Sequence, residues 1–198
     1  MTLELLNTFA TFGTFVVIAA TAIAALVQLR HARSSNQISA ISELQNEAAT
    51  AQFVTAEHSV RTELASKMKD PEFRYQLANR TARTAENLSF IQKVAAVANH
   101  YELLGVLVKR GLVDRDIALD MWCDIAQVMW GRLVPIVAIY RERMGSAVWE
   151  NFEHFVVLSQ DWDAAHPNGT YPAGVRRIDV KNEWLEADRQ YAASRGPA

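Results

Sequence analysis

The stretch that decides the fold is residues 5–29, LLNTFATFGTFVVIAATAIAALVQL, which contains no charged side chain. A transmembrane helix needs about 20 mainly apolar residues, at a rise of about 1.5 Å each, to cross a hydrocarbon core about 30 Å thick. Residues 9–29 meet that length, and their threonines can donate to carbonyls of their own helix, which makes them tolerable in lipid. The segment therefore predicts a transmembrane anchor over residues 1–30.

Two other interpretations of this segment are weaker. A cleaved signal peptide has a positively charged start and a short apolar core of about 7–15 residues. Here no Lys or Arg precedes Arg30, and the apolar run is longer. The core helix of a soluble domain rarely stays uncharged over such a length. An uncleaved single-pass anchor is the favoured interpretation.

Charges that flank the segment predict its orientation. Arg30 and Arg33 follow it directly, whereas only Glu4 precedes it. The positive-inside rule then places the N-terminus outside and the chain from Arg30 onward in the cytoplasm. The single cysteine, Cys123, fits a reducing compartment.

Composition and missing motifs narrow the classes of function. The chain has 20 Lys and Arg against 22 Asp and Glu, which argues against a nucleic-acid partner. One cysteine excludes an intramolecular disulfide and any multi-cysteine metal site. The sequence has no Gly-x-Ser-x-Gly and no glycine-rich phosphate loop. Cys123 has no basic neighbour and is expected to be a small core residue. We therefore expect no catalytic residue and no cofactor.

Residues 31–83 predict a helical stalk followed by a basic connector. No Pro or Gly occurs from residue 31 to 69, and Ile38, Ile41 and Leu44 form a narrow apolar stripe at helical spacing. We expect one long helix here, ending before the Asp70–Pro71 junction. Positive side chains then outnumber carboxylates over residues 61–83. This excess suits a surface that faces anionic headgroups, but a solvated helical surface is the favoured interpretation. The positive side chains are Arg61, Lys67, Lys69, Arg74, Arg80 and Arg83.

Residues 84–165 show helical periodicity throughout, without period-2 alternation, and predict an all-α antiparallel bundle. One helix is expected over 84–110, with Gly111 at its end and Asp114 as the N-cap of the next. Pro135 should kink or split that second helix, and Ser146 should cap a third. Residues 166–198 predict a turn-rich loop, an amphipathic helix over 179–191 and a frayed tail.

A set of residues in the middle of the chain has a distinctive spacing. It consists of YELLG at 101–105, KRGLVD at 109–114, Trp130, Pro135, Arg141 and WENFE at 149–153. This set resembles a family of small bacterial proteins that carry one N-terminal transmembrane helix and are catalogued as a domain of unknown function. The resemblance covers about residues 94–158 and, by its position, the N-terminal anchor, and it implies no activity. With the orientation above, it implies a location in the bacterial inner membrane.

Charged residues within the bundle are candidates for structural ion pairs. Glu102 lies among apolar neighbours, where an unpaired carboxylate is costly to bury. Its pairing with Arg141 is not assured, because the two residues lie at opposite ends of adjacent antiparallel helices. Arg132 or Arg141 can instead pair with Glu150 or Glu153. We expect ion pairs among these residues rather than a catalytic carboxylate.

Metal-binding patterns are incomplete. Glu150 and His154 lie four residues apart, one residue more than the Glu-x-x-His motif of di-iron bundles. Asp116, Asp120 and Asp124 form a row that is more typical of a solvated face. The sequence predicts no metal site.

Trp162 and Trp184 lie on more polar helices than the other tryptophans and are candidate interface residues. The expected function is a scaffold or regulator: an integral membrane protein with one span, whose cytoplasmic bundle binds a protein partner. One alternative is a metal- or ligand-binding bundle enzyme that uses Glu102, Glu150, Glu153 and His154. Another is a homo-oligomeric sensor that transmits a signal through the stalk.

Overall fold

The fold is all-α over the part of the chain that the computed structural model describes, namely the backbone of residues 3–195 and the side chains of residues 11–195. The helices are α1 (Leu3–Ala48), α2 (Ala51–Thr62), α3 (Leu64–Lys67), α4 (Pro71–Ala78), α5 (Ala85–Lys109), α6 (Arg115–Met144), α7 (Glu150–Ala165) and α8 (Leu185–Arg195), with a 3-10 turn at Arg80–Ala82. The predicted fold class is confirmed. Glu4 and the apolar side chains of residues 5–10 lie outside the described side chains, and the end of the predicted frayed tail, residues 196–198, lies outside the described residues.

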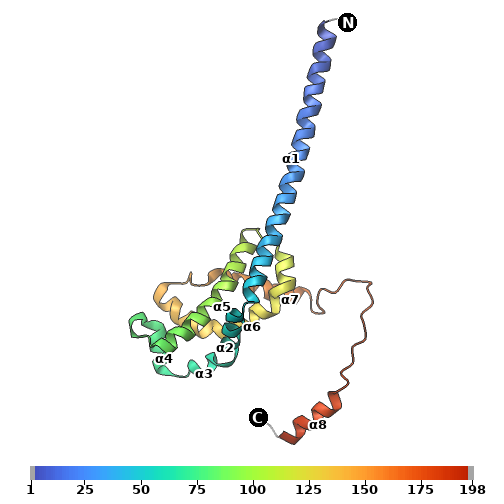
Figure 1. Ribbon diagram of the computed structural model, residues 1–198. Helices are drawn as coiled ribbons and strands as arrows, with labels where there is room; N and C mark the ends of the chain where they lie inside the picture. The colour runs from blue at the N-terminus through green and yellow to red at the C-terminus, as the bar shows by residue number, and fades with distance from the viewer. Residues whose placement is uncertain (1–2, 196–198) are drawn as a thin grey trace. The chain divides into compact units, whose positions relative to one another are not determined.

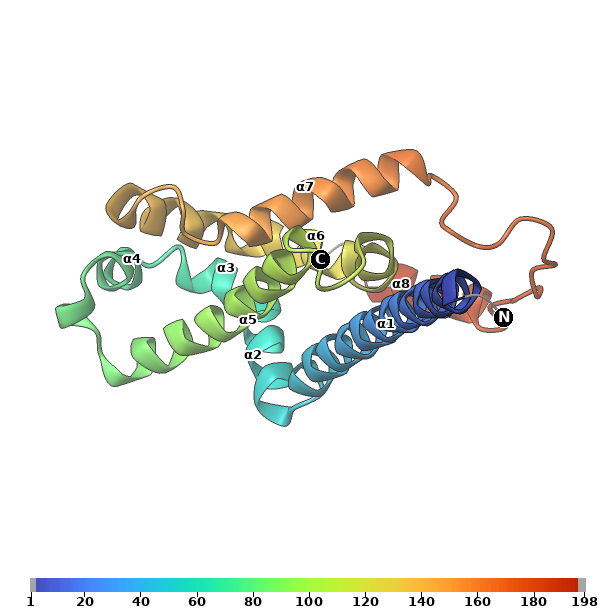
Figure 2. The same cartoon turned by 90° about the horizontal axis from the view of Figure 1, so that it is seen from above.

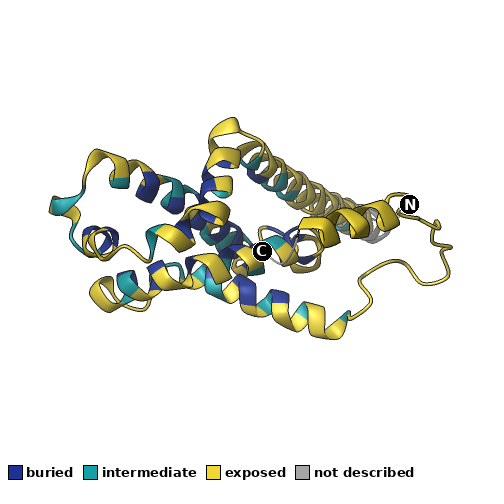
Figure 3. Ribbon diagram, turned by 90° about the horizontal axis from the view of Figure 1, so that it is seen from below, coloured by how far each residue is buried: buried dark blue, intermediate teal, exposed yellow. Residues whose placement is uncertain are grey.

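Helix α1 extends far beyond the bundle that its C-terminal turns join (Figure 1). The residues of its most apolar window are not buried by any described part of the protein, and side chains such as Phe15 and Leu26 are more than 60% exposed. Figure 3 shows this part of the helix exposed on every turn in view. An apolar, exposed N-terminal helix is typical of a membrane anchor or of a signal sequence.

The long helix is shorter than the sequence predicts. It ends at Ala48 instead of continuing to about residue 69, and α2 begins at Ala51 after a bend. The bend is stabilised by Thr50, whose hydroxyl accepts a hydrogen bond from the amide of Phe53 at 3.2 Å. Because Phe53 and Val60 are apolar enough to be buried, α2 packs against α5 within the bundle and is not part of an extended stalk.

Helices α5, α6 and α7 form the centre of the bundle (Figure 2). The predicted ends of α5 and the start of α6 are confirmed: Thr84 caps α5, Gly111 follows it with φ +65°, and Asp114 caps α6. Helix α6 continues through Pro135, so the predicted split is wrong. Pro135 lies on the exposed face of the helix.

The predicted cap of the third bundle helix is also wrong. Ser146 lies in a turn, and α7 begins at Glu150. Trp149, the residue before it, has left-handed backbone angles (φ 52°) and makes no side-chain capping bond. The first amides of α7 therefore need a hydrogen-bond acceptor from elsewhere in the fold.

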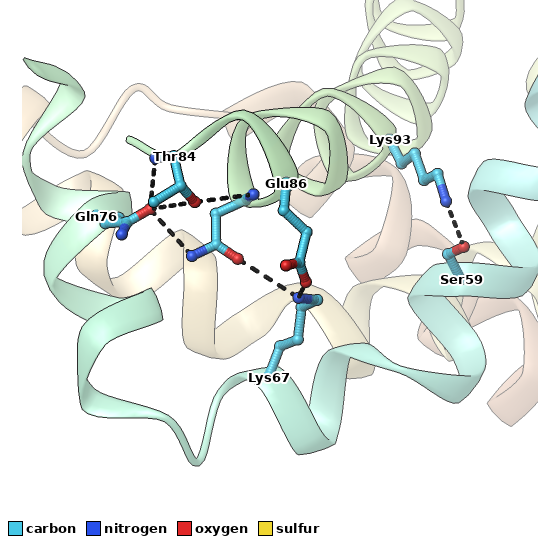
Figure 4. Close-up of polar contacts among 7 residues, drawn as sticks. Ser59, Lys67, Gln76, Thr84, Glu86 and Lys93 are labelled. Carbon is cyan, nitrogen blue, oxygen red and sulfur yellow. Dashed lines mark hydrogen bonds and ion pairs between the residues drawn. The ribbon is translucent and has the colours of Figure 1, made fainter. Parts of the chain in front are cut away.

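The basic connector lies at the end of the bundle away from the point where α1 leaves it (Figures 1 and 2). It contacts the start of α5, as Figure 4 shows: Lys67 Nζ donates to Glu86 at 3.0 Å. The buried side chain of Gln76 accepts hydrogen bonds from the Thr84 amide and the Asn87 side chain, both at 3.0 Å. These contacts hold α4 against the start of α5.

Residues 168–198 form a separate unit. The predicted turns are present, with positive φ at Gly169 and Gly174. Helix α8 begins later than predicted, at Leu185, and none of its residues is buried.

Candidate functional site: the crossing of α5 and α7

Helix α7 crosses α5 at Gly105. A Cβ at this position would collide with the backbone carbonyl of Asn151, so only glycine allows the two helices to approach this closely. The crossing brings together residues 101–105 and 149–153, the two ends of the distinctive sequence pattern. The pattern therefore describes a helix–helix contact.

Glu102 provides the missing cap of α7. Its Oε2 accepts hydrogen bonds from the amides of Asn151 at 3.0 Å and Phe152 at 2.8 Å. Its Oε1 accepts a hydrogen bond from the Asn151 side chain at 2.6 Å. A carboxylate at a helix N-terminus also interacts favourably with the helix dipole. Glu102 of α5 thus acts as the N-cap residue that α7 itself lacks.

The five charged residues that the sequence offers as ion-pair candidates have different partners in the structure. Glu102 forms no ion pair with any of the described side chains, because its oxygens bond the amides of α7 instead. Arg141 lies 2.8 Å from Glu153 and donates to the carbonyl of Val148 at 2.9 Å, so it holds the turn before α7. Glu150 lies 3.9 Å from Lys109. Arg132 is exposed and has no ion-pair partner among the described side chains.

Aromatic rings fill the crossing below these polar contacts. Tyr101 stacks on Phe152 with ring centroids 4.9 Å apart, and Trp130 meets Phe152 edge-on at 5.0 Å. Burial raises the pKa of Tyr101 well above its ordinary value, which keeps the phenol neutral. The crossing is packed and hydrogen-bonded in the manner of a structural joint, and it presents no activated nucleophile.

A second joint connects α1 to the bundle. His100 is buried in α5, and its Nδ1 lies 3.0 Å from Oε2 of Glu47, one residue before the end of α1. Its ring contacts Phe53 of α2 at 4.7 Å, and Leu44 of α1 is buried beside the same core. Sequence reasoning missed this contact, because no local signal relates residues that lie so far apart in the chain.

Cys123 belongs to a small polar cluster between α6 and α7. Its thiol lies 3.1 Å from Asp163 Oδ1 and 3.3 Å from the carbonyl of Ser159, and Gln127 donates to the other Asp163 oxygen at 2.6 Å. Burial, with Asp163 adding to it, raises the pKa of the Cys123 thiol to about 11. The thiol therefore keeps its proton at neutral pH, which disfavours nucleophilic chemistry.

The potential metal ligands do not form the sets considered from the sequence. Glu150, His154, Asp116 and Asp124 are all exposed. Among the described side chains, the group that comes within ligand range is Cys123, Asp124 and Asp163. A thiol that holds its proton against Asp163 is poorly prepared to bind a cation.

The two candidate interface tryptophans differ in their surroundings. Trp162 is half-buried against the core, and its ring lies 4.1 Å from that of His166. Trp184 is 70% exposed and belongs to the unit formed by residues 168–198.

A groove that sequence reasoning did not find lies between α1 and α5, with a volume of about 560 Å³. Its lining residues are Ala40, Glu43, Leu44, Glu47, Leu103 and Leu107.

The fold and its joints define a class: an all-α protein in which a long apolar N-terminal helix continues into a small helical bundle. A family model described as Domain of unknown function (DUF4760) matches residues 15–162, and the chain belongs to this family. The match includes most of the apolar segment and all of the bundle helices except the last turn of α7. No curated protein and no solved structure matches the chain.

Proposed function

We propose that this chain is a single-pass inner-membrane protein whose bundle binds a protein partner as a scaffold or regulator. One observation carries the proposal: the apolar part of α1 is covered by no described part of the protein, although the same helix packs into the bundle at Leu44. Water is a poor environment for such a surface, whereas the hydrocarbon core of a bilayer suits its length.

The proposed orientation has the N-terminus outside and the bundle in the cytoplasm of a bacterium. Arg30 and Arg33 at the bundle end of the apolar segment support this direction through the positive-inside rule. The protonated, buried thiol of Cys123 is compatible with a reducing compartment.

The groove between α1 and α5 is the surface we propose for the partner. Ala40, at its near end, follows Leu29 by eleven residues, or about 16 Å of helix, which places the groove beyond the headgroup layer. Leu103, in its wall, is 46% exposed, and Glu43 lies at its edge. These features suit a partner helix that carries apolar and basic side chains.

Native mass spectrometry of the full-length protein, extracted gently from its own membranes, tests this proposal. We expect the mass of this chain plus a second polypeptide. The variant Leu103→Asp should lose the second polypeptide, whereas Val157→Asp, at a similarly exposed position on α7, should retain it. A homo-oligomer alone, or an added metal or small molecule, would contradict the proposal.

A second candidate is a homo-oligomeric sensor, which the unbroken course of α1 favours. The helix continues from the apolar segment to the Glu47–His100 contact, so a rotation of the segment would reach α5 directly. Inserting one residue after Ser35 rotates the segment by about 100° relative to the bundle. A sensor predicts altered hydrogen exchange in α5 in the membrane-bound protein, and unchanged exchange would contradict this candidate.

A further inference from the structure

The corner between α5 and α6, residues 109–115, lies beside α1 at the end of the bundle nearest the apolar segment (Figure 1). Arg33 of α1 donates a hydrogen bond to the carbonyl of Gly111 at 3.4 Å. Arg33 follows Leu29 by four residues, or about 6 Å along the helix axis. The headgroup layer is about 5–8 Å deep on each side of a bilayer. If α1 spans a membrane as proposed above, the corner is therefore at headgroup depth.

The side chains of the corner fit that layer. Leu112, within the corner, is apolar but 56% exposed. Positive side chains occur both on the corner and on the adjacent turns of α1. They are Arg30, Arg33, Lys109, Arg110 and Arg115.

Nearby carboxylates offset this charge only in part. Asp114 accepts hydrogen bonds from the first amides of α6, Asp116 pairs with Arg115 at 3.0 Å, Asp161 lines the same pocket as Arg115, and Glu150 lies 3.9 Å from Lys109. The excess at the corner is positive in a chain whose net charge is −2, so the charge is distributed unevenly. The basic connector, by contrast, lies at the other end of the bundle with its Lys67 paired to Glu86.

We propose that the α5–α6 corner docks onto the anionic headgroups of the membrane that α1 crosses, with Leu112 in the interfacial layer. Docking of this kind combines an apolar contact with attraction between cations and anionic lipid. It fixes the bundle against the membrane surface at a second point, so that the α1–α5 groove faces the cytoplasm in a defined direction. The inference rests on the proposed anchoring by α1.

Lipid-quenching of fluorescence in nanodiscs tests the docking with the full chain. In a Cys123→Ala background, a fluorescent probe is attached to a single introduced cysteine. The three variants are Leu112→Cys at the corner, Tyr75→Cys on the distant helix α4 and Ala20→Cys in the apolar segment. Discs contain phosphatidylcholine alone or mixed with phosphatidylglycerol, and the spin label is on the headgroup or on the acyl chain.

We expect the headgroup spin label to quench position 112 far more than position 75 in discs with phosphatidylglycerol, and the quenching to fall in phosphatidylcholine. Each positive charge removed by Arg110→Gln or Arg115→Gln should lower the ratio of docked to undocked protein about fivefold. The matched variants Lys69→Gln and Arg143→Gln at exposed positions away from the corner should leave it unchanged.

Two outcomes would overturn the docking without overturning the anchor. In the first, acyl-chain labels quench position 20, but headgroup labels quench position 112 no more than position 75. In the second, position 112 is quenched equally in both lipid mixtures. Loss of quenching at position 20 as well would show that α1 is not in the bilayer, which overturns the proposed function together with the docking.

Discussion

Helices α1 and α6 both have the length and the composition of a membrane span, yet their surroundings are opposite. None of the most apolar window of α1 is buried, whereas 39% of the corresponding window of α6 is buried within the protein. In α6, Met129 and Leu133 point into the core while Asp124 and Arg132 are exposed. Hydropathy measures how apolar a helix is, but the distribution of its apolar residues around the axis decides whether protein or lipid covers it.

The largest difference between α6 and α1 is expected when an aspartate replaces an apolar residue in each helix. Leu133→Asp places an unpaired carboxylate at a fully buried position of α6 and should cost more than about 4 kcal/mol, enough to unfold the bundle. Circular dichroism and limited proteolysis in detergent measure this.

The same change in α1 should affect insertion instead of folding. Ile18→Asp, at a 63% exposed position, should weaken membrane insertion by about 3 kcal/mol and leave the bundle folded. Alkaline extraction of membranes measures insertion. Unfolding of the Ile18 variant, or a folded Leu133 variant, would reverse our assignment of the two helices.

Two glycines offer the next contrast, since one lies at the α5–α7 crossing and the other on the exposed face of α6. Gly105→Ala should destabilise the bundle by about 1–3 kcal/mol, because its Cβ collides with the Asn151 carbonyl. Gly131→Ala meets no atom within 4 Å and should stabilise α6 by up to about 1 kcal/mol. Urea unfolding of both variants measures the difference, and equal effects would refute the close crossing.

The cap supplied by Glu102 should contribute less than the packing at Gly105. Glu102→Ala leaves the first amides of α7 without their acceptor and should cost about 1–2 kcal/mol. Glu142→Ala, on the exposed end of α6, should change the stability by less than about 0.5 kcal/mol. Hydrogen exchange of the Asn151 and Phe152 amides should increase in the Glu102 variant alone.

The last prediction concerns Cys123 in α6 and the loss of stability at alkaline pH. Its folded pKa of about 11 lies above the ordinary value of 9.0, so the protonated thiol stabilises the fold below pH 9. This contribution should be lost as the pH rises from about 9 to 11. Unfolding of the wild type and Cys123→Ala over that range measures it. Alkylation of the thiol should be slow at pH 8, and rapid alkylation there would contradict burial of this face of α6.

Local signals in the sequence predicted local structure well. Gly111 and Asp114 mark helix ends because capping depends on residues a few positions apart. Ser146 offered the same kind of signal and was misleading, because α7 begins four residues later under a cap from another helix. A sequence pattern has no means of relating Glu102 to the amide of Asn151.

The candidate site is built from contacts between residues that lie far apart in the sequence. These contacts were the feature of the structure that the sequence predicted least well. Glu47 and His100 lie on helices whose packing follows from the bend at Thr50, which the sequence analysis did not anticipate. Gly105 stands in an apolar run where periodicity predicts a buried face but not the helix that crosses it. The resemblance selected the correct residues without indicating that they form a joint.

The mass of the intact chain recovered from washed membranes tests the central claim, that α1 remains in the membrane as an anchor. An uncleaved anchor predicts that the membrane fraction contains the full 22.2 kDa chain, with residues 1–30 present. A protein that lacks this segment, found in the soluble fraction, would show that α1 is a cleaved signal sequence and would contradict the claim.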